Sequence, residues 1–141
     1  MINAKDVVRM KIPYPDISAN LAVSSHMYIC KSVSGNVYEY VRCQTLKPKM
    51  LVGTLLKHYV DEEADILRNP FQRTTRIDCD KVFTTKSVQY DSRLKTTVRP
   101  DICQELYDQV MEEVVADRYV VIEMNEEELT SINPMITKIQ E

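Results

Sequence analysis

The stretch DVVRMKIPYPD at residues 6–16, followed by the apolar run MYIC at residues 27–30, indicates the fold of this chain. Residues 7–12 are a strand candidate. Pro13 and Pro15 end it, because proline has no N–H to donate to a neighbouring strand. The chain therefore begins with a short strand, a proline-bounded loop and a returning strand.

A β-hairpin is expected next. The returning strand is predicted over residues 27–33, and Ser-Gly-Asn at residues 34–36 is a turn signal. The following VYEYVRC alternates apolar and polar residues and is rich in residues that favour strands, so a third strand is predicted over residues 37–45. A short glycine turn between two such runs is typical of a hairpin.

The middle of the chain is less regular. Residues 46–70 contain Lys-Pro-Lys, which breaks any strand, and residues 51–59 fit either a short helix or another strand. One or two strands are expected within residues 74–85, followed by the strand-like segment 88–94.

The clearest helix is predicted over residues 101–116. Ile102, Leu106, Val110 and Val114 recur every four residues and form one apolar stripe, which indicates core packing. Asp101 with Gln104 three residues later is similar to a capping box. An apolar run follows at residues 119–122, and a short helix is expected to begin at residues 126–129.

Length and composition indicate one domain over residues 1–141. The chain is long enough to bury a core, and its 44% hydrophobic and 28% charged residues are ordinary for a globular protein. No apolar run approaches the roughly 20 residues that span a bilayer, and no signal peptide is recognisable at the N-terminus. We therefore expect no membrane partner and a cytoplasmic location.

The sequence predicts neither a metal site nor a cofactor. Its four cysteines are far apart, with no C-x-x-C pair, and only His26 and His58 could join them as ligands. We expect free, largely buried thiols. Two glycines in the whole chain exclude glycine-rich phosphate loops, which need several at fixed offsets.

The net charge of −3 hides an uneven distribution. Residues 42–99 carry twelve basic and seven acidic groups, whereas residues 100–141 carry two basic and eleven acidic groups. A basic middle beside an acidic C-terminal part is compatible with a nucleic-acid surface, although both can also be ordinary solvated faces.

In the order of these elements the chain resembles the MazF/PemK (Kid-like) growth-inhibitor family, the toxins of type II toxin–antitoxin modules. The resemblance covers roughly residues 5–115 and leaves residues 116–141 as an extension. It rests on the opening strand and loop (6–16), HMYIC (26–30), FTTKS (83–87) with Arg93 and Leu94, and the helix at 101–115. It implies a mainly β fold with a C-terminal helix, in the α+β class, built as a small SH3-like barrel.

The resemblance also implies a function. Members of the family are typically homodimeric, metal-independent endoribonucleases that cut single-stranded RNA and are silenced by an antitoxin protein. The family commonly places an Arg-Pro pair at the start of the second strand, where this chain has Ser25 and His26. Thr45 matches the Ser or Thr that the family uses at the end of the third strand. Near the family's further arginine this chain has Lys81 and Lys86.

Three residues are candidates for catalysis: His26, Thr45 and Arg42. His26 could replace the missing arginine as a general acid or base, since histidine titrates near neutrality. Arg42 shares a strand face with Gln44, and its planar guanidinium could hold a phosphate.

The candidates for nucleic-acid binding are Ser25, Tyr38, Tyr40, Gln44, Lys81 and Lys86. Tyr38 and Tyr40 share a face with Arg42, and aromatic rings beside a cation are a plausible platform for stacking single-stranded bases. Each of these residues also has an ordinary structural or surface reading.

Three functions therefore remain open. The first is a MazF-like endoribonuclease toxin. The second is a non-catalytic relative that binds RNA, DNA or protein on the same scaffold. The third is an interaction protein whose acidic part, residues 101–128, contacts a partner. Small-molecule metabolism has the least support, because no cofactor motif or dense acid–base cluster is present.

Overall fold

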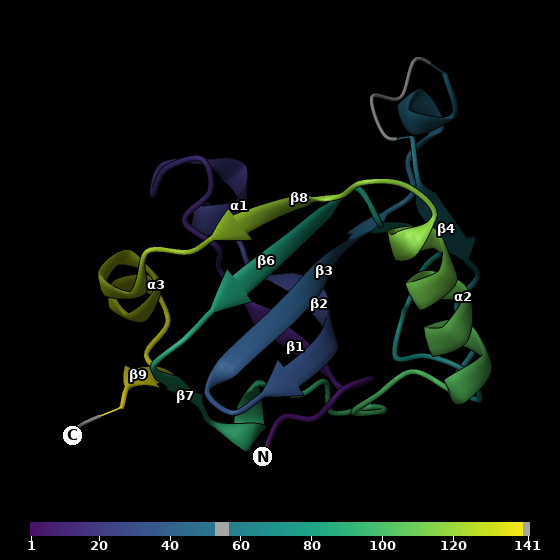
Figure 1. The fold of residues 1–141 in the computed structure, drawn as a ribbon. Helices are drawn as coiled ribbons and strands as arrows, with labels where there is room; N and C mark the ends of the chain where they lie inside the picture. The colour runs from purple at the N-terminus through teal and green to yellow at the C-terminus, as the bar shows by residue number, and fades with distance from the viewer. Residues whose placement is uncertain (53–56, 140–141) are drawn as a thin grey trace.

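A seven-stranded sheet forms the centre of the computed structural model, which describes residues 1–52 and 57–139. The chain is mainly β, with helices on both faces of the sheet (Figure 1). The strands are β1 (Val7–Met10), β2 (His26–Ser34), β3 (Val37–Thr45), β4 (Tyr59–Glu62), β5 (Thr75–Asp78), β6 (Lys81–Thr85), β7 (Val88–Tyr90), β8 (Val120–Glu123) and β9 (Ile136–Lys138). The helices are α1 (Asn20–Val23), α2 (Gln104–Val115) and α3 (Glu126–Ile132), with 3₁₀ turns η1 (Pro48–Leu51) and η2 (Ser92–Leu94).

The long strand β3 organises the sheet. It pairs along one side with β2, while its other side pairs first with β6 and then, near its C-terminal end, with β5. The sheet order is β1-β2-β3-β5-β4, and β8 extends the β6 branch in parallel. Within residues 1–52 and 57–139 no ladder joins β1 to β4 or β8, so the pairing does not close into a complete barrel.

The predicted hairpin is confirmed. β2 and β3 pair antiparallel from Met27↔Cys43 to Ser34↔Val37, with one irregularity between Cys30 and Ser32. Gly35 lies in the connecting turn at φ +59°, a conformation that glycine adopts without steric cost. The opening strand pairs with β2 from Val7↔Ile29 to Met10↔His26, as the strand–loop–strand order predicts.

Helix α2 covers one face of the sheet, as its apolar stripe predicts. Leu106, Val110 and Val114 are buried and pack with residues of β1, β2, β3 and β5. The predicted capping box is wrong. The helix begins after Cys103, whose Sγ accepts a hydrogen bond from the Leu106 N–H at 3.4 Å, while the Asp101 carboxylate pairs with Arg99 at 2.9 Å.

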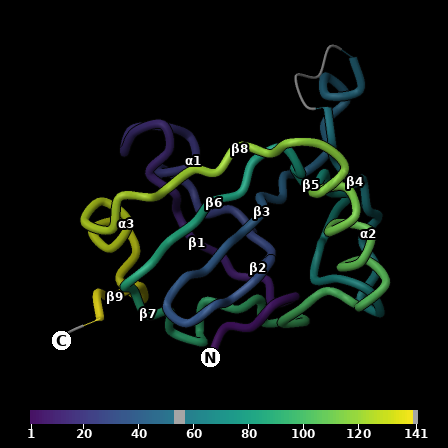
Figure 2. The backbone as a smooth tube through the Cα atoms, in the orientation of Figure 1, coloured from purple at the N-terminus to yellow at the C-terminus, as the bar shows by residue number. Residues whose placement is uncertain are grey.

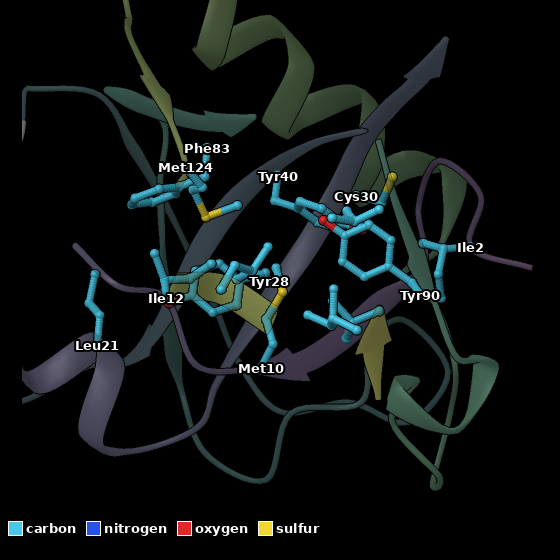
Figure 3. Close-up of a cluster of buried hydrophobic side chains, with 14 residues drawn as sticks. Ile2, Met10, Ile12, Leu21, Tyr28, Cys30, Tyr40, Phe83, Tyr90 and Met124 are labelled. Carbon is cyan, nitrogen blue, oxygen red and sulfur yellow. The ribbon is translucent and has the colours of Figure 1, made fainter. Parts of the chain in front are cut away.

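An aromatic cluster fills the opposite face (Figure 3). Tyr28, Tyr40 and Phe83 are essentially inaccessible to solvent, and the rings of Tyr28 and Phe83 meet edge to face at 5.9 Å. Leu21 of α1, Leu129 of α3 and residues of the two-stranded β7–β9 sheet close this side of the core.

Residues after 116 take part in this core. β8 runs beside β6, and α3 and β9 follow on the side of the aromatic cluster (Figure 2). Leu129 and Ile136 are 0% and 1% exposed. Asn133 joins the C-terminal segment to Lys11, the residue that follows β1. Its side chain accepts a hydrogen bond from the Lys11 N–H at 2.8 Å and donates one to the Lys11 carbonyl at 2.7 Å.

The described part of the irregular middle of the chain contains one 3₁₀ turn and three strands, η1, β4, β5 and β6. The open choice over residues 51–59 falls partly on residues 53–56, outside the described residues; η1 precedes them and β4 follows. Residues 74–85 contain two strands, β5 and β6. All four cysteines are free, and three are buried. Within residues 1–52 and 57–139, no helix has the length and apolar character required to cross a bilayer.

Candidate functional site

A cleft of about 500 Å³ opens at the end of the sheet where α2 no longer covers it. Its floor comes from a row of paired residues on one face, in which Arg9 lies opposite Met27 and Met27 lies opposite Cys43. On β1 the residue two positions before Arg9, Val7, belongs to the core beneath α2. Strand alternation therefore places Arg9 on the same face, just beyond the covered core.

The cleft is strongly basic. Arg9, Lys47, Lys49 and Arg73 line it, and no aspartate or glutamate is among its lining residues. Among residues 1–52 and 57–139, no carboxylate lies within 4.0 Å of any of these four cations. In a chain with a net charge of −3, this concentration of uncompensated positive charge is suited to binding an anion.

One wall of the cleft is held by the buried side chain of Arg76 on β5. Its guanidinium pairs with Asp61 at 2.8 Å, donates to the Met50 carbonyl at 2.9 Å and stacks on the Tyr59 ring at 3.8 Å. The bond to Met50 fixes η1, which carries Lys49 and follows Lys47 directly. Arg76 thus positions two cations of the cleft without lining it.

A second part of the cleft lining is held by Asn69. Its side chain is fully buried, donates to Glu62 at 2.8 Å and accepts from the Phe71 N–H at 3.0 Å. Phe71 packs into the core beneath α2. This anchoring presents the exposed Gln72 and Arg73 to the cleft.

His26 lines the cleft at the start of β2, where its surroundings favour the neutral imidazole. Burial lowers the pKa of His26, and the nearby Arg42 and Arg9 lower it further, against a hydrogen bond to the Ser24 carbonyl. Because a carbonyl only accepts, Nδ1 donates that 2.9 Å bond, which leaves the lone pair on Nε2. A neutral imidazole with a free Nε2 can act as a general base.

Four of the residues selected from the sequence meet in this cleft. Ser25, His26, Gln44 and Thr45 all line it, and Thr45 pairs with Thr75 of β5 at its edge. The two strands that carry them lie side by side, and their pair Met27↔Cys43 forms part of the cleft floor. The hairpin itself therefore brings the second-strand and third-strand candidates together.

Arg42 does not line the cleft. It pairs with Tyr28 in the β2–β3 ladder, and its side chain points to the face opposite Thr45 by strand alternation. Its Nε is buried and has no hydrogen-bond partner among the described residues. On that face burial raises the pKa of Asp78, and the charge of Arg42 opposes part of that rise. Its influence on the cleft is electrostatic, through His26.

The tyrosine pair lies in the core. Tyr40 is completely buried, and its ring is stacked on Tyr38 at 6.4 Å and packed against Tyr90 at 5.5 Å. Core side chains occupy the faces that a nucleotide base would need. In this structure the Tyr38–Tyr40 pair therefore serves the aromatic cluster and does not offer a stacking platform.

The two candidate lysines of β6 also lie elsewhere. Lys81 is half-buried with its ammonium 6.0 Å from the centre of the Tyr14 ring, and Lys86 is exposed just after the strand. Neither lines the cleft.

Sequence reasoning missed the principal cations of the site: Arg9, Lys47, Lys49 and Arg73. The excess of positive charge over residues 42–99 includes three of them, but their convergence depends on the pairing of β1 with β2 and on two long loops.

No group of three histidine, cysteine, aspartate or glutamate side chains within residues 1–52 and 57–139 is arranged to hold a metal ion. Comparison with protein families, with curated proteins and with solved structures finds no match for this chain.

Proposed function

We propose that this protein binds single-stranded RNA in the basic cleft. The observation that carries the proposal is a concave site with four cations and no acidic lining residue, in a chain that is acidic as a whole. Cations in such a site neutralise the phosphates of a nucleic acid and release the counterions bound to them, which favours binding. A flexible single strand can follow the lining of such a basic cleft with its backbone.

The resemblance to the MazF/PemK family supports RNA as the nucleic acid. The opening strand, the proline-bounded loop, the hairpin and the later helix occur in the order that the resemblance requires. On this proposal the sheet is a divergent, partly open relative of the family's SH3-like barrel. A homodimer and an antitoxin-like protein partner belong to the same proposal.

The direct test is binding of a fluorescent single-stranded RNA, measured by anisotropy at low salt in EDTA. Arg73→Gln and Lys49→Gln each remove one cleft cation and should weaken binding about threefold to tenfold, as loss of a phosphate contact does. Lys86→Gln is the matched control, because it removes one positive charge from an exposed site outside the cleft. Equal weakening by all three variants would indicate a non-specific charge effect and contradict the proposal.

Metal-independent RNA cleavage is the second candidate, favoured by the neutral His26 with its free Nε2 among cations. Nε2 would take the proton of a 2′-hydroxyl, and the 2′-oxygen would bond to phosphorus as the bond to the 5′-oxygen breaks. Water would protonate the leaving oxygen, giving a cyclic phosphate and a 5′-hydroxyl end. Cleft cations would stabilise the charge that develops on the phosphate.

Non-catalytic binding remains the alternative to cleavage, because the described cleft residues include no second group that titrates near neutrality. Incubation of a long RNA with the protein in EDTA separates the two. Cutting that His26→Asn abolishes while RNA binding persists supports catalysis by His26. Intact RNA under conditions where it is bound establishes a binding module.

A further inference from the structure

A second hollow, of about 390 Å³, lies next to the basic cleft and is continuous with it. The two share Arg9, Ser25, Met27 and Gln72 as lining residues. The second hollow lies between the β1 side of the sheet, the segment 93–98 and the segment 132–135 that follows α3. A chain bound in the cleft could therefore pass over Arg9 into this hollow without leaving the surface.

Positive charge continues into the second hollow. Arg9, Lys11, Arg93 and Lys95 line it, and again no acidic residue does. Arg93 pairs with Asp91 at 2.7 Å and Lys95 pairs with Asp6 at 3.1 Å. Among the described residues, no carboxylate lies within 4.0 Å of Arg9 or Lys11, so these two cations are open to a phosphate.

The hollow also has an apolar side, which binding of phosphates alone would not need. Met27, Leu94, Ile132, Pro134 and Met135 line it. Met135 is 39% exposed. A phosphate needs cations, whereas an unstacked base needs apolar surface against its flat faces, and this hollow offers both. Its volume falls within the roughly 300–1,000 Å³ range of small-molecule pockets.

Asn133 fixes the apolar wall in place. Its side chain is 5% exposed, exchanges two hydrogen bonds with the Lys11 backbone and donates a third to the Leu129 carbonyl at 2.8 Å. The residues on either side, Ile132 and Pro134, are thereby held beside β1. The hollow is a preformed site rather than a gap between loosely attached segments.

From this arrangement we infer that the second hollow is a nucleotide subsite of the RNA-binding surface, with its wall supplied by the C-terminal segment 132–135. The inference rests on the proposed function and adds the path of the strand: phosphates near Arg9 and Lys11, and a base against Met135 and its apolar neighbours. Residues 116–141, which the family resemblance leaves out, then take part in substrate binding.

The test uses the full chain and unstructured oligouridylates of increasing length, with affinity measured by anisotropy in EDTA. Met135→Glu places a carboxylate in the subsite at an exposed position. Thr137→Glu adds the same charge at an exposed position of β9 outside the hollow, and is the matched control. Lys11→Gln is a second variant that removes a cation from the subsite.

For the longest oligomers, Met135→Glu should weaken binding about tenfold and Lys11→Gln about threefold or more, with little effect of Thr137→Glu. The wild type should gain affinity with oligomer length, and this gain should be smaller in both subsite variants. Equal affinities of Met135→Glu and Thr137→Glu at every length would overturn the subsite. If Arg73→Gln still weakened binding in that case, the proposed function would stand without it. Failure of the wild type to bind any oligomer would overturn both.

Discussion

Arg76 illustrates how a single buried cation can shape a site that it does not line. Its side chain is 2% exposed, and its Nε and Nη2 both donate to the Asp61 carboxylate. Its third bond, to the Met50 carbonyl, reaches across from β5 to η1. Stability and cleft geometry therefore depend on the same side chain.

Replacing Arg76 with leucine should destabilise the fold by about 2 kcal/mol, because the Met50 carbonyl and Asp61 lose their partner. The figure is below the upper range for buried pairs, since Asp61 is 32% exposed and regains water. Urea unfolding measures this change, and anisotropy should show weakened RNA binding by the folded variant. Arg73→Gln should weaken RNA binding alone, and an Arg76→Leu variant with unchanged stability would contradict the account of the wall.

The two histidines should have pKa values on opposite sides of the ordinary value for an imidazole, His26 below it and His58 above it. Burial, followed by Arg42 and Arg9, lowers the pKa of His26, whereas the hydrogen bond to Glu113 raises the pKa of His58. Two separate NMR transitions of the imidazole protons should appear, the lower one missing in His26→Asn. Arg9→Gln should raise the lower value. Two coincident transitions would argue against the electrostatic environment assigned to His26.

At the scale of elements, His58, the residue just before β4, links this strand to the end of α2. Its Nδ1 lies 2.8 Å from Glu113 of α2, and its Nε2 lies 3.6 Å from Asp117 just after the helix. The same segment is bonded to the sheet, because the His58 N–H donates to Asp80 at 3.1 Å. Helix and sheet are thus joined by an ion pair whose strength depends on pH.

The His58 pair should make stability depend on pH with a defined sign. A pKa raised in the folded state means that the protonated, paired form is favoured by folding. Its contribution is therefore fully present below the unfolded pKa of about 6.5 and is lost as pH rises through the folded value. Thermal unfolding from mildly acidic to alkaline pH should show this loss in the wild type. His58→Gln should lack it, and an identical pH profile for both proteins would refute the assignment.

The elements that could be predicted from the sequence are those with local signals. The hairpin followed from alternation and Gly35, and α2 from its four-residue stripe, because both patterns reflect burial of one face. The helix start was missed because Asp101 pairs with Arg99 and leaves the cap to Cys103. For the site, the family resemblance selects Ser25, His26 and Thr45, and strand alternation adds Gln44 on the face of Arg42. Arg9 and Arg73 could not be selected, since only tertiary pairing brings them together.

At the scale of the whole molecule, charge is separated in a way that the net value conceals. The acidic residues of α2 and α3 line neither hollow, while the two hollows together collect seven Arg and Lys side chains. A chain with a negative net charge can therefore still present one surface that attracts a polyanion. On this charge separation rests the proposal that the connected basic surface binds single-stranded RNA through its phosphates.

Salt dependence of RNA binding tests this claim most directly, because each phosphate contact to single-stranded nucleic acid contributes about −0.7 to the slope of log K against log salt. Four cleft cations predict a slope of roughly −3 for the wild type. They also predict a slope about 1.4 shallower for the double variant Arg9→Gln/Arg73→Gln, with Lys86→Gln unchanged. Wild-type binding with a slope near zero, or a slope that the double variant leaves unaltered, would contradict the account.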